Sequence, residues 1–270
     1  MTSRHRSPSR WAWVVAAAAT GLVAACDNSL SGISTQQTWG FVTIAASKST
    51  GGSHFADIEG LFFKGALSAV PNAAFTADTC ADAVLTTGNN LVGVTYLDAG
   101  PTISTTIGGV PSQLARTTTA NGLAYYPSGS VSYNPGDSVV IDVTGVTGGF
   151  PAGTIRARTA EAFTFSNIDV PAGTAAIPIT WSAPADPNSA IVLSLRYETT
   201  ANPGQLTRNV LCTFIDDGVD SIPFRWHQPW SASSGNKEVV VTRLRTNYVA
   251  AGDGNLGVIS TYQVPTPPPE

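Results

Sequence analysis

The chain has 270 residues, of which 43% are hydrophobic and 12% are charged, and its formal net charge is −4. This composition is that of a globular protein and excludes a disordered chain. The weak acidic charge, without a cluster of basic residues, argues against nucleic acid as a partner.

The first 26 residues combine a basic start, an apolar run and a cysteine. Three arginines precede an apolar stretch over residues 11–25, and Ala24 and Ala25 lead directly to Cys26. About 15 apolar residues are too few for a membrane-spanning helix, which needs about 20. The basic start and the small residues at the end are typical of a secretory signal peptide.

The sequence Leu22-Val23-Ala24-Ala25-Cys26 resembles the lipobox of bacterial lipoproteins. The resemblance implies that residues 1–25 are a lipoprotein signal peptide and that Cys26 is the acylated first residue of the mature chain. Its acyl chains would attach the protein to a membrane of the cell envelope, outer or periplasm-facing, since each buried methylene contributes roughly 0.8 kcal/mol. An uncleaved anchor helix and plain secretion with a free thiol are the alternatives. The mature chain would carry 11 basic and 18 acidic residues, a net charge of −7.

Two further cysteines, Cys80 and Cys212, remain for the mature domain. An even pair in an oxidising compartment favours a disulfide. The alternative is two buried free thiols, since cysteine is among the most buried residue types. A catalytic thiol is disfavoured because the two histidines of the mature chain, His54 and His227, lie in no recognisable nucleophile motif.

The ends of the mature chain are predicted to be irregular. Residues 26–38 are rich in Ser, Gly, Gln and Thr and predict a flexible tether. Residues 264–270 form a Pro-rich tail. Between them, a β ectodomain is expected over residues 39–263.

The ectodomain is predicted to consist of β-strands only. Short runs rich in Val, Ile, Thr and aromatic residues recur, bounded by Gly, Pro, Asn or Asp. The expected strands are 39–47, 58–67, 90–98, 102–107, 122–126, 138–144, 154–157, 162–165, 176–181, 190–198, 209–214, 239–245 and 257–263. No window has a sustained helical period, so the predicted fold class is all-β.

The even spacing of the strands favours an antiparallel β-sandwich. Residues 177–197 resemble the start of a fibronectin type III or immunoglobulin-like domain. A strand ends in Trp181, a Pro-rich loop follows, and the run 191–197 then alternates. The resemblance implies an immunoglobulin-like sandwich. The Gly-rich break around 145–153 leaves open whether two sub-sandwiches, 39–145 and 150–263, are fused.

Two short segments resemble a pattern in β-rich surface lipoproteins of environmental bacteria. They are Leu97-Asp98-Ala99-Gly100 and the cysteine-containing run over residues 211–223. The resemblance implies the architecture and a Cys80–Cys212 bridge. It supplies no catalytic residue.

The turn over residues 216–220 is a candidate calcium site. Asp216, Asp217 and Asp220 could offer oxygen ligands, of which Ca²⁺ takes six to eight. However, no Glu follows at the closing position of a twelve-residue calcium loop. The favoured interpretation is a tight hairpin, because Asp-Gly is a strong turn signal.

The run over residues 224–230 is a candidate binding surface. Trp226, His227 and Trp230 could form an aromatic platform on which sugar rings stack. The favoured alternative is that the two tryptophans cover the end of the sandwich, since large aromatics in β proteins are usually core residues. The two hypotheses differ in whether both indoles are exposed on one face. The strand residues Trp39, Tyr125, Tyr126 and Trp181 are also predicted to be packing residues.

The sequence contains no nucleophile elbow, phosphate loop, zinc spacing or dinucleotide fingerprint. We therefore expect no enzyme and no cofactor. The predicted function is that of a lipid-anchored envelope protein with a structural or adhesive role. Its partners would be the membrane and an envelope protein or polysaccharide, and a carbohydrate-binding module is the alternative.

Overall fold

The structure is a computed structural model, and it describes residues 37–48, 52–65, 78–84, 94–120, 122–129, 131–166, 168–185 and 188–264. The predicted signal peptide, Cys26, nearly all of the tether and the tail from residue 265 lie outside these residues. The described chain is all-β apart from one short helix, as predicted.

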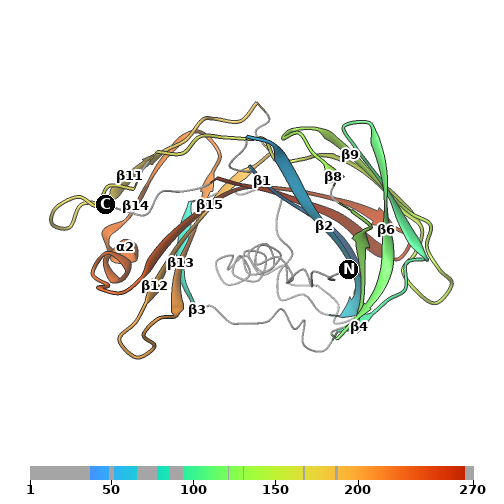
Figure 1. Cartoon of the computed structure of the whole chain (residues 1–270), viewed down its shortest axis with the longest axis horizontal. Coiled ribbons are helices and arrows are strands. Elements are labelled where there is room, and N and C mark those ends of the chain that lie inside the picture. Colours follow the sequence, from blue (N-terminus) through green and yellow to red (C-terminus); the bar gives the residue numbers. More distant parts are fainter. Residues whose placement is uncertain are drawn as a thin grey trace, which may run out of the picture.

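One large sheet of 14 strands dominates the fold, and a second sheet has two strands, β11 and β14. The order along the large sheet is β10-β9-β5-β6-β7-β2-β1-β16-β15-β12-β13-β3, with β4 and β8 paired to β2 (Figure 1). The strands are β1 (Gln37–Lys48), β2 (His54–Gly65), β3 (Thr79–Val84), β4 (Thr95–Tyr96), β5 (Thr102–Ile107), β6 (Val110–Thr119), β7 (Gly122–Pro127), β8 (Val131–Ser132), β9 (Ser138–Val143), β10 (Gly153–Arg158), β11 (Ile177–Thr180), β12 (Ala190–Glu198), β13 (Leu206–Ile215), β14 (Val219–Ile222), β15 (Lys237–Ala251) and β16 (Gly254–Val264).

The large sheet is mixed, which corrects the prediction of a purely antiparallel one. The first and last strands, β1 and β16, lie side by side and run parallel, with Val42 opposite Val258. The other pairs in this sheet are antiparallel. A parallel pair needs a long connection, and here the rest of the domain provides it.

The structure does not confirm an immunoglobulin-like sandwich. Instead of two sheets of similar size, one long sheet bends through the whole molecule, and the β11–β14 pair and the helix lie on its outer side (Figure 1). The two candidate halves, 39–145 and 150–263, share this sheet. Strand β3 of the first half pairs with β13, and β16 of the second half lies beside β1.

The main core lies on one face of the large sheet. Its aromatic members are Phe62, Tyr125, Tyr133, Phe150, Phe163, Trp181, Phe214, Trp230 and Tyr262. Strand β1 contributes Val42, Ile44 and Ala46, which alternate with side chains on the opposite face, as the period of two requires. At Gly40 the strand has no room for a side chain, because a Cβ there would lie 2.6 Å from the ring of Phe62.

The helix α2 (Phe224–Ser231) was not expected from the sequence. It begins after Pro223, contains Pro229 and turns His227 and Trp230 inward. Eight residues are too few for a helical period to stand out in the sequence. No helix in the described part of the chain is long and apolar enough to cross a bilayer.

Candidate functional site

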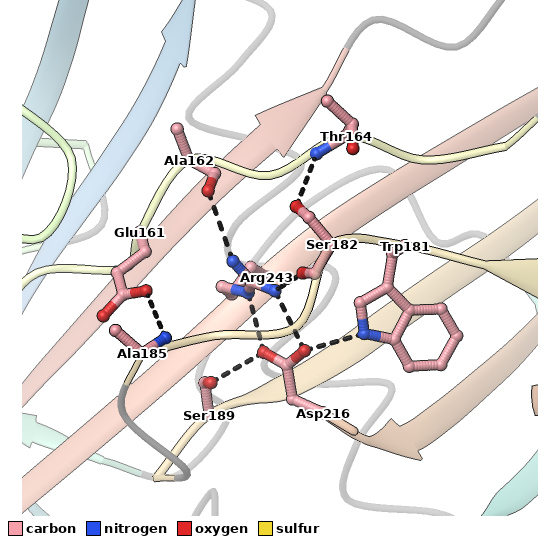
Figure 2. Close-up of polar contacts among 9 residues, drawn as sticks. All are labelled: Glu161, Ala162, Thr164, Trp181, Ser182, Ala185, Ser189, Asp216 and Arg243. Atoms are coloured by element: carbon pink, nitrogen blue, oxygen red, sulfur yellow. Dashed lines mark hydrogen bonds and ion pairs between the residues drawn. The ribbon is translucent and has the colours of Figure 1, made fainter. Parts of the chain in front are cut away.

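The most elaborate polar cluster in the described chain surrounds the carboxylate of Asp216 (Figure 2). Asp216 directly follows β13, and Arg243 lies in the middle of β15. The guanidinium of Arg243 donates two hydrogen bonds to Asp216, from Nε to Oδ2 at 2.6 Å and from Nη2 to Oδ1 at 3.0 Å. The indole N–H of Trp181 donates to Oδ1 at 2.7 Å, and the Ser189 hydroxyl donates to Oδ2 at 2.6 Å. Each carboxylate oxygen therefore accepts two hydrogen bonds.

Arg243 connects this carboxylate to two irregular segments that cross the sheet. Its guanidinium also donates to the carbonyl of Ser182 at 2.6 Å and to the carbonyl of Ala162 at 3.3 Å, and it lies 4.8 Å from the ring centroid of Phe163. The Arg243 side chain is 1% exposed and that of Asp216 is fully buried. Because these groups are buried and bond to one another and to the backbone, the cluster fastens the two segments to β15.

The calcium hypothesis is not supported by these contacts. The carboxylate of Asp216 is occupied by four donors, and Asp217 accepts the backbone N–H of Val219 at 3.2 Å. Burial raises the pKa of Asp220, with the nearby Asp78 acting in the same direction. Among the described residues, no group of three His, Cys, Asp or Glu side chains could hold a metal ion.

The Asp-Asp-Gly segment (residues 216–218) forms a turn, as the sequence predicted, but this turn does not close a hairpin. Gly218 has a φ of 106°, a conformation that glycine adopts without strain. The strand that follows, β14, does not pair with β13. It leaves the large sheet and pairs with β11, with Ile222 opposite Ile177. The hairpin prediction was therefore wrong because the turn connects two different sheets.

The proposed aromatic platform is not exposed. Trp230 and His227 are each 1% exposed, and Trp226 packs partly buried against the main core. His227 Nε2 lies 3.0 Å from the carbonyl oxygen of Ala175, which can only accept, so this nitrogen donates a hydrogen bond to it. The sugar-platform hypothesis required both indoles on one open face, and α2 instead places Trp230 inside. This arrangement agrees with a packing role.

A second polar cluster holds the segment Leu97-Asp98-Ala99-Gly100. The hydroxyl of Tyr125 accepts the backbone N–H of Ala99 at 2.8 Å. Its one hydrogen is shared between the carbonyl of Gly100 at 2.9 Å and Asp98 Oδ1 at 3.1 Å. Asp98 accepts the N–H of Gly100 at 2.9 Å and forms an ion pair with Arg116. The Gly100 N–H, the Tyr125 hydroxyl and the Arg116 charge hold the pKa of Asp98 below its usual range. The conspicuous sequence of this segment thus has a structural explanation.

We predict that Tyr125→Phe destabilises the protein by about 1–3 kcal/mol, because it leaves a buried N–H and a carbonyl without their partner. The ring itself is fully buried and would keep its packing. Denaturant unfolding of the variant measures the effect. Tyr126→Phe, at a neighbouring tyrosine that is 36% exposed, is the control and is expected to change stability less. Equal effects would contradict the role assigned to the Tyr125 hydroxyl.

A shallow depression lies beside the C-terminal end of α2. It has a volume of about 270 Å³, and its lining includes Tyr197, Glu198, Pro229 and Ser233. Hydrogen bonds from the backbone N–H groups of Gly204 and Asn236 lower the pKa of the Glu198 carboxyl. A carboxylate held in its charged form is a poor general acid. The titratable side chains of this lining are Tyr197 and Glu198.

The disulfide between Cys80 and Cys212 is present, as predicted. The two residues face each other in the pairing of β3 with β13, and their Cα atoms are 4.0 Å apart. Cys212 is fully buried in the main core. The bridge therefore joins an edge strand of the large sheet to its only partner among the described strands.

No family model matches this sequence, and no curated protein matches it.

Proposed function

We propose that this chain is a lipid-anchored protein of the bacterial cell envelope with a structural or interaction role. The observation that carries the proposal is the Cys80–Cys212 disulfide. Disulfides persist in oxidising compartments outside the cytosol. The bridge also uses both cysteines of the domain, so Cys26, at the end of the lipobox-like sequence, is the one cysteine left for acylation.

The polar clusters support a role without catalysis. The groups around Asp216 and Tyr125 bind each other and the backbone, so they hold irregular segments in place. A catalytic site needs a nucleophile, acid or base that can reach a substrate. In the two clusters these groups are bonded internally, so they are not presented to a substrate. The ectodomain acts in this proposal as a rigid body at the end of its tether.

The anchor is tested by Cys26→Ala in the full chain, expressed in a bacterium and supplied with radiolabelled palmitate. The wild-type chain is expected to carry the label and to sediment with membranes. The variant is expected to lose the label and to appear in the soluble envelope fraction, because acylation is what holds a domain of this kind on a membrane. Ser29→Ala, in the tether, is the control and is expected to behave as wild type. A variant that stays bound to the membrane would refute the anchor.

A further inference from the structure

The depression beside α2 lies between two short loops, where α2 and the end of β12 meet (Figure 1). One loop follows β12 over residues 199–205, and the other connects α2 to β15 over residues 232–236. The pairing of β12 with β13 shifts in register between Tyr197 and Glu198, directly before the first loop. Such irregularities are frequent next to functional sites, where they redirect a side chain. The depression therefore lies where the sheet departs from regular pairing.

Hydrogen bonds fix the two loops relative to each other. The side-chain amide of Asn236 donates to Glu198 Oε2 at 2.8 Å, and the Ser233 hydroxyl donates to the carbonyl of Glu198 at 2.8 Å. The backbone N–H of Glu198 in turn donates to the carbonyl of Asn236 at 3.0 Å. The walls of the depression are thus held in place by the protein itself, which lowers the entropic cost of binding a ligand there.

The lining of the depression is rich in groups that bond to hydroxyl groups. Five of its nine residues carry a hydroxyl themselves: Tyr197, Thr199, Thr200, Ser233 and Ser234. Glu198 adds a carboxylate, whose pKa is lowered by the N–H groups of Gly204 and Asn236. A charged carboxylate is a stronger acceptor for hydroxyl donors than a neutral oxygen. None of the nine residues is Lys or Arg, so the lining does not favour an anion.

The depression is open to solvent and has an apolar wall. None of its nine lining residues is buried. The rings of Tyr197 and Pro229 belong to the lining, and Tyr197 also packs against the main core, which holds its ring in position. Tyrosine combines an apolar ring face with a polar end. An apolar wall beside several hydroxyl groups is the combination that a sugar ring requires, since its C–H face is apolar and its edge is polar.

The size of the depression fits one sugar ring. Its volume is about 270 Å³. A water molecule takes up about 30 Å³ in the liquid, so the depression has room for roughly nine waters. Pockets for drug-sized ligands begin at about 300 Å³. The occupant is therefore expected to be a single small ring, with any further part of the ligand outside the depression.

We propose that the depression beside α2 binds one sugar ring of a neutral glycan. The ring lies against Tyr197 and Pro229, and its hydroxyl groups exchange hydrogen bonds with Thr200, Ser234 and Glu198. A quaternary ammonium ion is the other ligand class for an aromatic ring beside a carboxylate, but it is held by a cage of several aromatic rings. The depression has one. The proposal goes beyond the lipid anchor and does not depend on it.

The test is titration of the full purified chain with a panel of neutral oligosaccharides of glucose, galactose, mannose and N-acetylglucosamine. Saturable binding of at least one of them is expected. The double variant Thr200→Val/Ser234→Ala removes two exposed hydroxyl groups from the lining and is expected to bind that oligosaccharide about tenfold more weakly. The matched control is Thr118→Val/Ser104→Ala, at exposed positions of β6 and β5 several strands away, and its affinity should equal that of wild type.

A second measurement tests the ring of Tyr197. Saturation-transfer NMR, with the aromatic protons of the protein irradiated, is expected to transfer signal to the ring hydrogens of the bound sugar. Tyr197→Phe keeps the aromatic ring and should retain the transfer, whereas Tyr197→Leu should lose most of it. Thermal unfolding of both variants checks that they are folded.

Three results would each overturn the proposal. The first is the absence of saturable binding for every oligosaccharide of the panel. The second is equal affinity of the double variant and its control. The third is displacement of the oligosaccharide by tetramethylammonium ions, which would indicate a cation site. Palmitate labelling of Cys26 is independent of all these measurements, so the anchor and the sugar site fail separately.

Discussion

Replacing Asp216 with alanine is expected to lower the free energy of unfolding by about 3–5 kcal/mol, because it leaves a buried charge without its partner. Arg243 is 1% exposed and cannot reach water when the carboxylate is removed. The indole N–H of Trp181 and the hydroxyl of Ser189 lose their acceptor at the same time. This is the largest effect that we predict for a single substitution.

Denaturant unfolding of Asp216→Ala beside Asp217→Ala measures this loss. Asp217 is the adjacent residue and is exposed, so its substitution is expected to cost little. The double variant Asp216→Ala/Arg243→Met removes both charges and should recover part of the stability, since apolar replacements of buried pairs are often well tolerated. An Asp216→Ala variant as stable as Asp217→Ala would contradict the role of this cluster as a fastening between β13 and β15.

Replacing Cys212 with alanine is expected to cost about 2–5 kcal/mol, the usual range for a native disulfide. The physical reason lies in the position of β3. This strand has six residues, lies at the edge of the large sheet and pairs only with β13 among the described strands. Without the bridge, the long loop between the two cysteines is no longer constrained in the unfolded chain.

The loss appears as a lower Tm in thermal unfolding, larger than that caused by any surface substitution. A reducing agent should lower the Tm of the wild type to the value of the variant. The double variant Cys80→Ala/Cys212→Ala is the control, and its Tm should not respond to the reducing agent. A wild-type Tm that is unchanged by reduction would mean that the two thiols are not paired in the protein.

The sequence was most informative where local pattern decides structure. Strand β12 (Ala190–Glu198) has the bounds that its alternation predicted, and so does β5 (Thr102–Ile107). Strand β6 (Val110–Thr119) was missed, because its run of polar residues is exposed at most positions and lacks an apolar alternation. The expected strand at 162–165 is reduced to a single bridge between Phe165 and Trp181.

The contacts that organise the sites could not be predicted, because they depend on the order of strands in space. Asp216 and Arg243 are 27 positions apart, and their pairing requires β13 and β15 to flank β12. Similarly, the neighbouring positions of β1 and β16 bring Phe41 opposite Gly257. Trp39 was correctly expected to pack, but nothing in its local sequence indicated that it packs with Phe41 and Phe63 in a cluster separate from the main core.

The central claim, attachment through a lipid on Cys26, is tested most directly by mass spectrometry of the N-terminal peptide of the protein isolated from bacterial membranes. The account predicts a peptide that begins at Cys26 and carries the added mass of two or three acyl chains. A peptide that still contains residues 1–25, or one with an unmodified Cys26, would contradict it.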